Sequence, residues 1–309
     1  MISRRNIRVK VMQTLYALSA QEDERDNVKT RHRLLEDKLH RSMELFTVSI
    51  LYVLRTAQYA EQDAAQRRGK WMPTSEDLMV NTKIAGNEFL WSVLENESFK
   101  AAVEQGSLEN YVQEDWVRKL YQELVKTPEY AAYIALESRD KTSEKNILRF
   151  IWEQLILANE KVQELFTEEL PGWEDDQMMI QMLMDNYFKQ PKKVNFLNLL
   201  SAEKRQYAYE LLDTCLEKEA QLQQLISPRL ANWDAERVAL IDLILLRMGV
   251  CELLYFPTIP TKVTINEYID IAKDYSTEQS GHFVNGVLDN VLKDLVRNNQ
   301  INKQERFKK

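Results

Sequence analysis

The chain has 309 residues, of which 44% are hydrophobic, and a formal net charge of −7. This is enough apolar material for one large core or two ordinary ones, while the acidic balance argues against a general nucleic-acid binder. Only seven glycines and seven prolines are present, which excludes a protein built mainly from strands and tight turns. Long segments rich in Leu, Glu, Lys and Gln with a 3.6-residue apolar period predict an all-α protein.

Charge is distributed unevenly along the sequence. Residues 1–21 carry +4 and residues 293–309 carry another +4, so the 271 residues between them carry −15. Two basic ends on an acidic body would attract a polyanion at one place if the fold brought those ends together. The alternative for the C-terminal end is a solvated charged tail.

The first predicted helix runs from about Arg4 to Ala20, with Ser3 as its cap. Positive charge at a helix N-terminus opposes the helix dipole, so the arginines do not stabilise this helix locally. We therefore expect them to meet an external anion, an exposed basic turn without a role being the alternative. The apolar stripe comprises Ile7, Val11, Leu15 and Leu18, and the strip beside it comprises Arg5, Arg8, Met12 and Tyr16.

A long acidic region follows, in which helical segments alternate with short breaks. Capping signals such as "TSED" at Thr74 support several helix starts. We interpret residues 22–195 as an inserted or enlarged helical region whose role the sequence does not reveal. Its tryptophans are spaced as anchors of helix cores: Trp71, Trp91, Trp116, Trp152 and Trp173.

The pattern becomes clearer towards the C-terminus. A helix from about Ala202 to Leu225 precedes "AERVALIDLILLRMGVCELLYF", which is apolar on nearly every face and is predicted to be the central buried helix. The segments "TINE" and "STEQ" both match the capping-box pattern. Two further helices are therefore predicted to begin at Thr264 and Ser276.

The last of these helices contains Asn285-Gly286, a dipeptide that is typical of turns. Gly286 would lie opposite the apolar stripe, where a glycine costs a helix roughly 1 kcal/mol relative to alanine. Its missing side chain would let another molecule approach the backbone. We expect Asn285 to hydrogen-bond an adjoining element. A tolerated surface glycine is the alternative.

Enzyme chemistry finds no support in the sequence. The three histidines are widely separated, and zinc spacings, phosphate-binding glycine loops and the hydrolase nucleophile elbow are all missing. We expect no catalytic residues, no metal and no cofactor. No run is long enough to cross a bilayer, and Cys215 and Cys251 lie in apolar helical contexts, so we expect buried thiols, no membrane association and a cytoplasmic location.

A binding surface is better supported. If the last helix packs beside the first, cations, an aromatic face and an open backbone would adjoin one another. Single-stranded RNA needs cations for its phosphates and π surfaces for its unstacked bases. The candidate RNA-binding residues are Arg4, Arg5, Arg8, Tyr16, Gln279, Phe283 and Gly286.

At these residues the sequence resembles the NusB family of bacterial transcription antitermination factors. The segment "RRNIRVKVMQTLYA" resembles the arginine-rich first helix of the family, and "KVTINE" and "FVNGVLD" resemble signatures of its C-terminal half. The resemblance covers about residues 3–20 and 196–297. It implies an all-helical fold of two small subdomains, with an RNA-binding helix in residues 1–21 and a C-terminal subdomain with a basic tail in residues 196–309. The acidic region between them has little counterpart in the family, and it either enlarges the N-terminal subdomain or forms an added one.

The resemblance also implies a function. Members of the family bind the boxA element of nascent ribosomal RNA together with the ribosomal protein NusE, within the RNA polymerase antitermination complex. Asn6 stands where the family commonly has a third arginine, and Gln279 where it often has an acid, so the first change weakens attraction to RNA and the second removes a repulsion. The RNA surface of the family maps onto Arg4, Arg5, Arg8, Tyr16, Lys262, Gln279 and Phe283, and its NusE surface onto Glu236 and Asp242.

Two other interpretations remain. A helical scaffold could bind only protein through the acidic region, and retention of boxA-like RNA by the purified chain separates that hypothesis from the first. A NusB-like domain also forms the N-terminal part of ribosomal RNA cytosine methyltransferases. Those enzymes need a glycine-rich, cofactor-binding α/β domain as well, and only twelve residues follow the NusB-like second half of this sequence.

Overall fold

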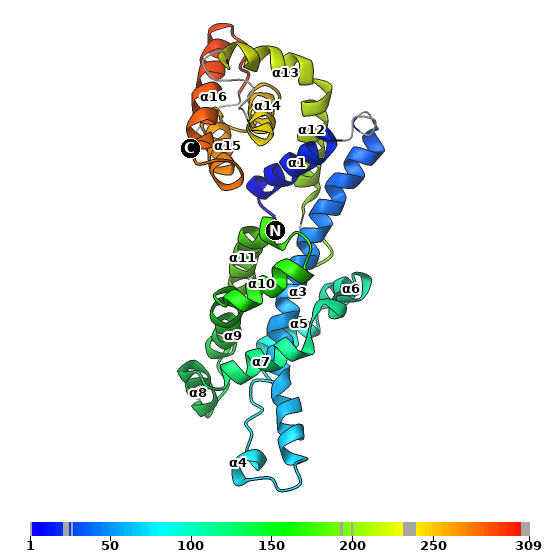
Figure 1. Cartoon of the computed structure of the whole chain (residues 1–309), viewed down its shortest axis with the longest axis vertical. Coiled ribbons are helices and arrows are strands. Elements are labelled where there is room, and N and C mark those ends of the chain that lie inside the picture. Colours follow the sequence, from blue (N-terminus) through cyan, green and yellow to red (C-terminus); the bar gives the residue numbers. More distant parts are fainter. Residues whose placement is uncertain are drawn as a thin grey trace. The chain divides into compact units, whose positions relative to one another are not determined.

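The computed structural model describes residues 2–20, 25, 27–191, 194–198, 200–230 and 239–303. These residues form helices and no strand, which confirms the all-α prediction. They fall into two compact units, shown in Figure 1. Unit 1 is His40–Leu199, and unit 2 combines Ile2–Leu39 with Leu200–Lys309. Within the described ranges, no helix has both the length and the hydropathy that a membrane crossing requires.

Unit 1 is organised around the long helix α3 (Val28–Arg68), whose residues up to 39 belong to unit 2. Phe166 is fully buried, with its ring 4.9 Å from that of Tyr52 on α3 and 4.8 Å from that of Trp173. Short helices continue around this core: α4 (Ser75–Leu78), α5 (Glu88–Leu94), α6 (Glu97–Gln105), the 3₁₀ helix η1 (Leu108–Tyr111), α7 (Glu114–Leu124), α8 (Pro128–Ala135), α9 (Lys141–Phe150), the π-helix η2 (Ile151–Leu157), α10 (Glu160–Glu169) and α11 (Trp173–Lys189).

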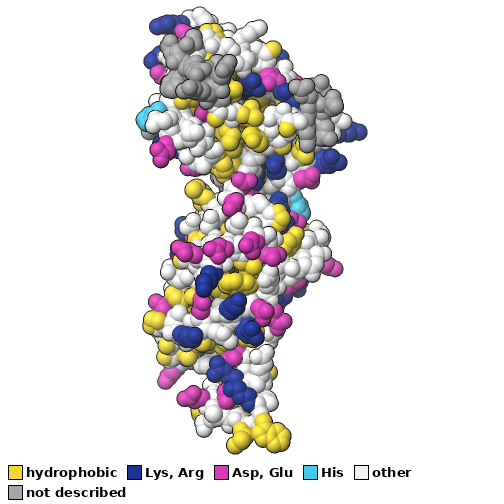
Figure 2. Space-filling view, viewed as in Figure 1, with side chains coloured by type: hydrophobic (Ala, Val, Ile, Leu, Met, Phe, Trp, Pro, Cys, Tyr) yellow, Lys and Arg dark blue, Asp and Glu magenta, His cyan; other side chains and the backbone are white. Residues whose placement is uncertain are grey.

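The turn between α3 and α4 corrects one prediction. The capping box at Thr74 is present, with Asp77 as its acidic member. Trp71, however, is 98% exposed, and Trp91 is also exposed, so the prediction that both anchor the core is wrong, whereas Trp152 and Trp173 are buried as expected. Helix α3 ends at Arg68, so Trp71 lies in the turn that follows and not on a helix face. Helix α4 lies at one end of unit 1 in Figure 1, and Figure 2 shows apolar side chains protruding at that end.

Unit 2 surrounds the helix α14 (Leu240–Tyr255), which is buried along most of its length. Figure 1 shows this helix enclosed by its neighbours, which include α1 and α16. A Cβ atom at Gly249 of α14 would lie 2.9 Å from a methyl carbon of Leu288, so this glycine permits the close approach of α16. The neighbours are α1 (Arg4–Ser19), α12 (Ala202–Glu217), α13 (Glu219–Ile226), the 3₁₀ helix η4 (Ser227–Arg229), α15 (Thr261–Tyr275) and α16 (Ser280–Arg297).

Of the three capped helix starts predicted in unit 2, the first is confirmed and the two later ones are wrong. Ser3 caps α1 as expected, because its side chain accepts a hydrogen bond from the Asn6 amide. The two later capping boxes are wrong, since α15 begins after Pro260 and α16 begins at Ser280. Proline fixes its own φ at a value that suits a helix start. Thr264 therefore lies inside α15 and is buried.

The first part of α3 packs in unit 2 rather than with the acidic region that follows it. Arg31 and His32 both contact the carboxylate of Asp213 on α12, at 2.7 and 2.8 Å. Arg205 of α12 pairs with Glu36 at 2.7 Å. Ion pairs thus attach residues 28–39 to α12, and the boundary between the two compact units falls near residue 40.

Candidate nucleic-acid interface

The first two arginines of α1 lie at the surface of unit 2, each beside a carboxylate. Arg4 pairs with Glu203 of α12 at 2.7 Å. Arg5 pairs with Asp274 of α15 at 2.8 Å and lies 3.7 Å from Asp270. The positive charge that opposes the helix dipole is therefore balanced within the chain. This balance corrects the expectation that the dipole argument by itself requires an external anion.

Arg8 has a different environment and is only 2% exposed. Its Nε and Nη2 atoms donate to the two carboxylate oxygens of Glu252 on α14, both at 2.9 Å, and Nη1 donates to Glu267 at 3.2 Å. Tyr207 and Thr264 donate to the same Glu252 carboxylate, each at 2.7 Å. This geometry corrects the expectation that Arg8 meets RNA directly, because every face of its guanidinium is already enclosed.

The buried pair shifts the protonation of both partners. Burial alone would raise the pKa of Glu252, but the hydrogen bonds and charge of Arg8, together with Thr264 and Tyr207, outweigh it and lower that pKa. Burial would likewise lower the pKa of Arg8, yet the hydrogen bond to Glu252 raises it above the ordinary value. The pair is therefore fully charged at neutral pH and joins α1 to α14.

The remaining candidates divide into exposed and buried residues. Tyr16, Lys262 and Gln279 are exposed, as contact with RNA would require. Phe283 is only 4% exposed, so the expectation that it offers an aromatic face is wrong; it belongs to the apolar stripe of α16. Within the described residues, Tyr16 is the candidate whose ring is accessible for stacking.

Gly286 lies on the solvent face of α16, as predicted. A Cβ atom built there would meet no other atom within 4 Å, so packing does not require a glycine at this position. Asn285 is exposed, and no described residue forms a hydrogen bond with its side chain, which corrects the expectation of an adjoining partner. The open backbone around Gly286 is the part of the Asn-Gly hypothesis that this environment supports.

The sequence predicts that the last helix packs beside the first, but each of them packs mainly on other helices. The main packing partners of α1 are α12 and α14, and α16 packs on α14 and α15. The C-terminal end of α15 connects the two sets, because Asp274 pairs with Arg5 while the aliphatic stem of Lys273 crosses α16 at Gly281. Lys273 is a cation near Arg5 that sequence analysis missed, since its position on α15 alone carries no sign of that proximity.

Part of the basic C-terminal tail also has an internal contact. The Nζ atom of Lys303 donates to the carbonyls of Glu252 and Phe256, at 2.8 and 2.9 Å. Both carbonyls lie at the C-terminus of α14, where a cation interacts favourably with the helix dipole. Lys303 is thus anchored and not a freely solvated charge.

Two residues are expected to face a protein partner, and the structure describes one of them. Asp242 is buried in the first turn of α14 and accepts a hydrogen bond from the hydroxyl of Ser280 at 2.8 Å. It connects the starts of α14 and α16, which corrects the expectation that it is an accessible surface charge. Glu236 lies outside the described residues.

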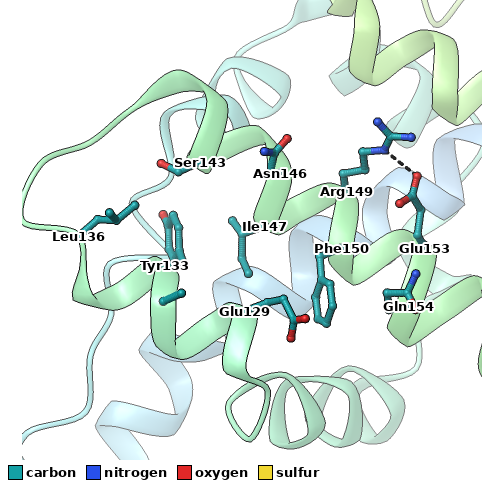
Figure 3. A pocket seen from close by; sticks show the side chains of 11 residues that line it. Glu129, Tyr133, Leu136, Ser143, Asn146, Ile147, Arg149, Phe150, Glu153 and Gln154 are labelled. Carbon is teal, nitrogen blue, oxygen red and sulfur yellow. Dashed lines mark hydrogen bonds and ion pairs between the residues drawn. The ribbon is translucent and has the colours of Figure 1, made fainter.

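Unit 1 contains a groove that the sequence did not indicate. Side chains of α8, α9 and η2 line this groove, as Figure 3 shows. Its volume is about 570 Å³. Tyr133, Ile147 and Phe150 line its apolar part, and Arg149 pairs with Glu153 at its edge at 2.6 Å. Arg149 and Glu153 neutralise each other at this edge, and Glu129 is the other charged side chain that lines the groove.

Comparison with known proteins connects this geometry to a family. The model of the NusB family matches residues 160–293, from the start of α10 to within α16. A transcription antitermination protein NusB from Methylacidiphilum infernorum is 37% identical over 144 residues, which are 46% of this chain and 95% of that protein. The chain belongs to the NusB family. The match to the family model begins at residue 160, within unit 1. The resemblance seen in the second half of the sequence begins later, at about residue 196.

Other NusB proteins are similar over shorter lengths. The transcription antitermination protein NusB of Salinibacter ruber is 43% identical over 102 residues, covering 33% of this chain and 64% of the relative. That of Listeria monocytogenes serotype 4a is 39% identical over 94 residues, covering 30% and 73% respectively. Each of these alignments covers less than half of this chain, whose additional length sets it apart from these NusB relatives.

Proposed function

We propose that this NusB family member is a cytoplasmic, RNA-binding transcription antitermination factor. It binds boxA-like single-stranded RNA of nascent ribosomal RNA transcripts together with the ribosomal protein NusE, as part of the RNA polymerase antitermination complex. The observation that carries the proposal is the surface formed by α1 and its neighbours in unit 2. Arg4 and Arg5 are accessible at the start of α1, and the half-exposed ring of Tyr16 lies near the end of the same helix.

The physical requirements of single-stranded RNA match this surface. RNA phosphates need cationic side chains, which Arg4, Arg5 and the exposed Lys262 supply. Unstacked bases need an aromatic ring on which to stack, which Tyr16 supplies. Gln279 offers an exposed amide that donates and accepts hydrogen bonds. Arg8 and Phe283 support the surface from beneath instead of touching RNA.

The test is a titration of fluorescently labelled boxA RNA at several salt concentrations. With three cations engaged, log affinity against log salt should have a slope of about −2, because each phosphate contact contributes about −0.7 for a single strand. Changing Arg4 and Arg5 together to alanine should flatten the slope to about −0.7. Arg8 is left intact, since its loss would unfold the site and confuse the result.

The matched control removes two exposed, ion-paired arginines from unit 1, Arg55 and Arg118. This double alanine variant should keep the wild-type slope. Addition of purified NusE should tighten RNA binding by the wild-type chain. An unchanged slope in the Arg4 and Arg5 variant would place RNA elsewhere, and an RNA affinity indifferent to NusE would contradict joint binding.

A further inference from the structure

Two cations of unit 2 converge on the same carboxylate. Asp270 of α15 lies 3.7 Å from Arg5 and 3.7 Å from Lys273. Asp274, one turn further along α15, forms the closer pair with Arg5 at 2.8 Å. A carboxylate therefore already occupies the place between an arginine and a lysine where an anion would bind.

The position of Lys273 is built into the fold. A Cβ atom at Gly281 would lie 2.9 Å from Cγ of Lys273 and 3.1 Å from its Cε. The absence of that Cβ atom leaves room for the lysine stem to cross the start of α16, so its ammonium group reaches the surface near Asp270. Long lysine stems commonly pack on a surface in this way while the charge remains in water.

We propose that Arg5 and Lys273 form one phosphate-binding subsite of the RNA surface, and that Asp270 and Asp274 occupy its cations until RNA displaces them. This inference rests on the proposed function and adds to it a contact, Lys273, and an internal competitor. The chemical class of the ligand is a phosphodiester of single-stranded RNA.

Displacement is feasible because these pairs are accessible. The side chain of Arg5 is 27% exposed and that of Asp274 is 31% exposed, so either can turn into solvent. Arg8 offers the contrast, since its buried, two-pronged pair with Glu252 has no solvated alternative. The carboxylates of α15 thus attenuate RNA binding without abolishing it.

The chain offers a closely matched control pair on α16. Lys293 is 60% exposed, as is Lys273, and it pairs with Asp289 at 2.6 Å within the same unit. Lys273→Gln and Lys293→Gln therefore make the same change of charge at equal exposure. Asp274→Asn and Asp289→Asn likewise make the same change of charge, at side chains that are 31% and 48% exposed.

The experiment measures binding of labelled boxA RNA by these four variants, with thermal melting to confirm that each is folded. Lys273→Gln should weaken binding and reduce the salt slope by about 0.7, the contribution of one phosphate contact to a single strand. Asp274→Asn should strengthen binding by about fivefold, the upper end of what an exposed ion pair contributes. Both control variants should leave the affinity within about twofold and the slope unchanged.

Two further measurements separate local competition for Arg5 from a general effect of charge: the rates of RNA association and dissociation, and the effect of Asp274→Asn in a chain that also carries Arg5→Ala. Neutralising any exposed acid raises the association rate through electrostatic steering. Asp274→Asn should in addition slow dissociation, because the carboxylate that pairs most closely with Arg5 can no longer recapture it. In an Arg5→Ala background the gain from Asp274→Asn should disappear. A gain that persists in that background, or equals the gain from Asp289→Asn, overturns the proposed competition.

The outcomes also distinguish this inference from the function on which it rests. If the wild-type chain binds boxA RNA but Lys273→Gln behaves like Lys293→Gln, the subsite is wrong and the proposed function stands. If neither the wild-type chain nor Asp274→Asn binds RNA at low salt, the proposed function and this inference both fail.

Discussion

At the scale of single residues, three neighbouring arginines of α1 have different roles. Arg4 and Arg5 make surface ion pairs, while Arg8 forms a buried pair with Glu252. Removing one partner of a buried ion pair leaves the other charge unpaired, which typically costs about 3–5 kcal/mol. Arg8 thus holds α1 in place so that its first turn can present the other two cations.

The Glu252 carboxylate should make stability depend on acid pH. Its pKa in the folded protein is lowered from the ordinary value of 4.5, so the stability it contributes is fully present above that value and is lost as pH falls through the lowered value. Glu252→Gln should reduce the free energy of unfolding by about 3–5 kcal/mol near neutral pH. Urea unfolding at a series of pH values should show this difference shrinking below pH 4.5.

Glu203→Gln serves as the control for this series. Glu203 pairs with Arg4 at the surface and is 78% exposed, so the substitution should change stability by less than about 1 kcal/mol. A difference between wild type and Glu252→Gln that stays constant from neutral to acid pH would contradict a charged carboxylate at this position.

At the scale of helices, the glycines of α14 and α16 serve different purposes. Gly249 faces Leu288 at a distance that leaves no room for a methyl group, whereas Gly286 faces open space. Both occupy helices, where alanine is intrinsically preferred by about 1 kcal/mol. The environment therefore decides the sign of each substitution.

Gly286→Ala should stabilise unit 2 by up to about 1 kcal/mol through helix propensity. Gly249→Ala should destabilise it by about 1–3 kcal/mol, because the added methyl group overpacks the contact between α14 and α16. Thermal melting of the two variants checks both signs. If RNA passes over the open backbone of α16, Gly286→Ala should also weaken RNA binding; greater stability with unaltered RNA affinity would identify Gly286 as a tolerated surface glycine.

At the scale of the whole molecule, the chain has two cores, and the proposed RNA surface belongs to one of them. The described residues that we propose to bind RNA belong to unit 2, and the groove between α8, α9 and η2 belongs to unit 1. Substitutions in the two cores should therefore affect RNA binding differently.

Phe166→Ala tests this separation. Its ring is fully buried in unit 1, so the substitution should destabilise that unit by about 3–5 kcal/mol. RNA affinity below the melting transition should equal that of the wild type. Leu211→Ala, which empties a buried site on α12 of unit 2, should lower stability and RNA affinity together. Loss of RNA binding in Phe166→Ala, with unit 2 still folded, would contradict the division of tasks.

Local patterns in the sequence were sufficient for the helical class, the start of α1, the central buried helix and the solvent-facing position of Gly286. These features depend on apolar periodicity and capping, which involve residues within a few positions of each other. The motifs resembling the NusB family added the family itself. Periodicity failed at Trp71, where a helix ends and the next residues no longer follow its period.

Only the tertiary structure decided which polar residues are available to a ligand. Arg8 and Glu252 are 244 positions apart, and nothing local marks the arginine as buried while Arg5 remains accessible. Lys273 likewise depends on the gap at Gly281 for its place beside Asp270. Burial and ion pairing are set by contacts between distant segments, whereas helix formation is set mainly by neighbours in the chain. The sequence therefore determined the helices and the family, and the packing of α1, α14, α15 and α16 determined the surface.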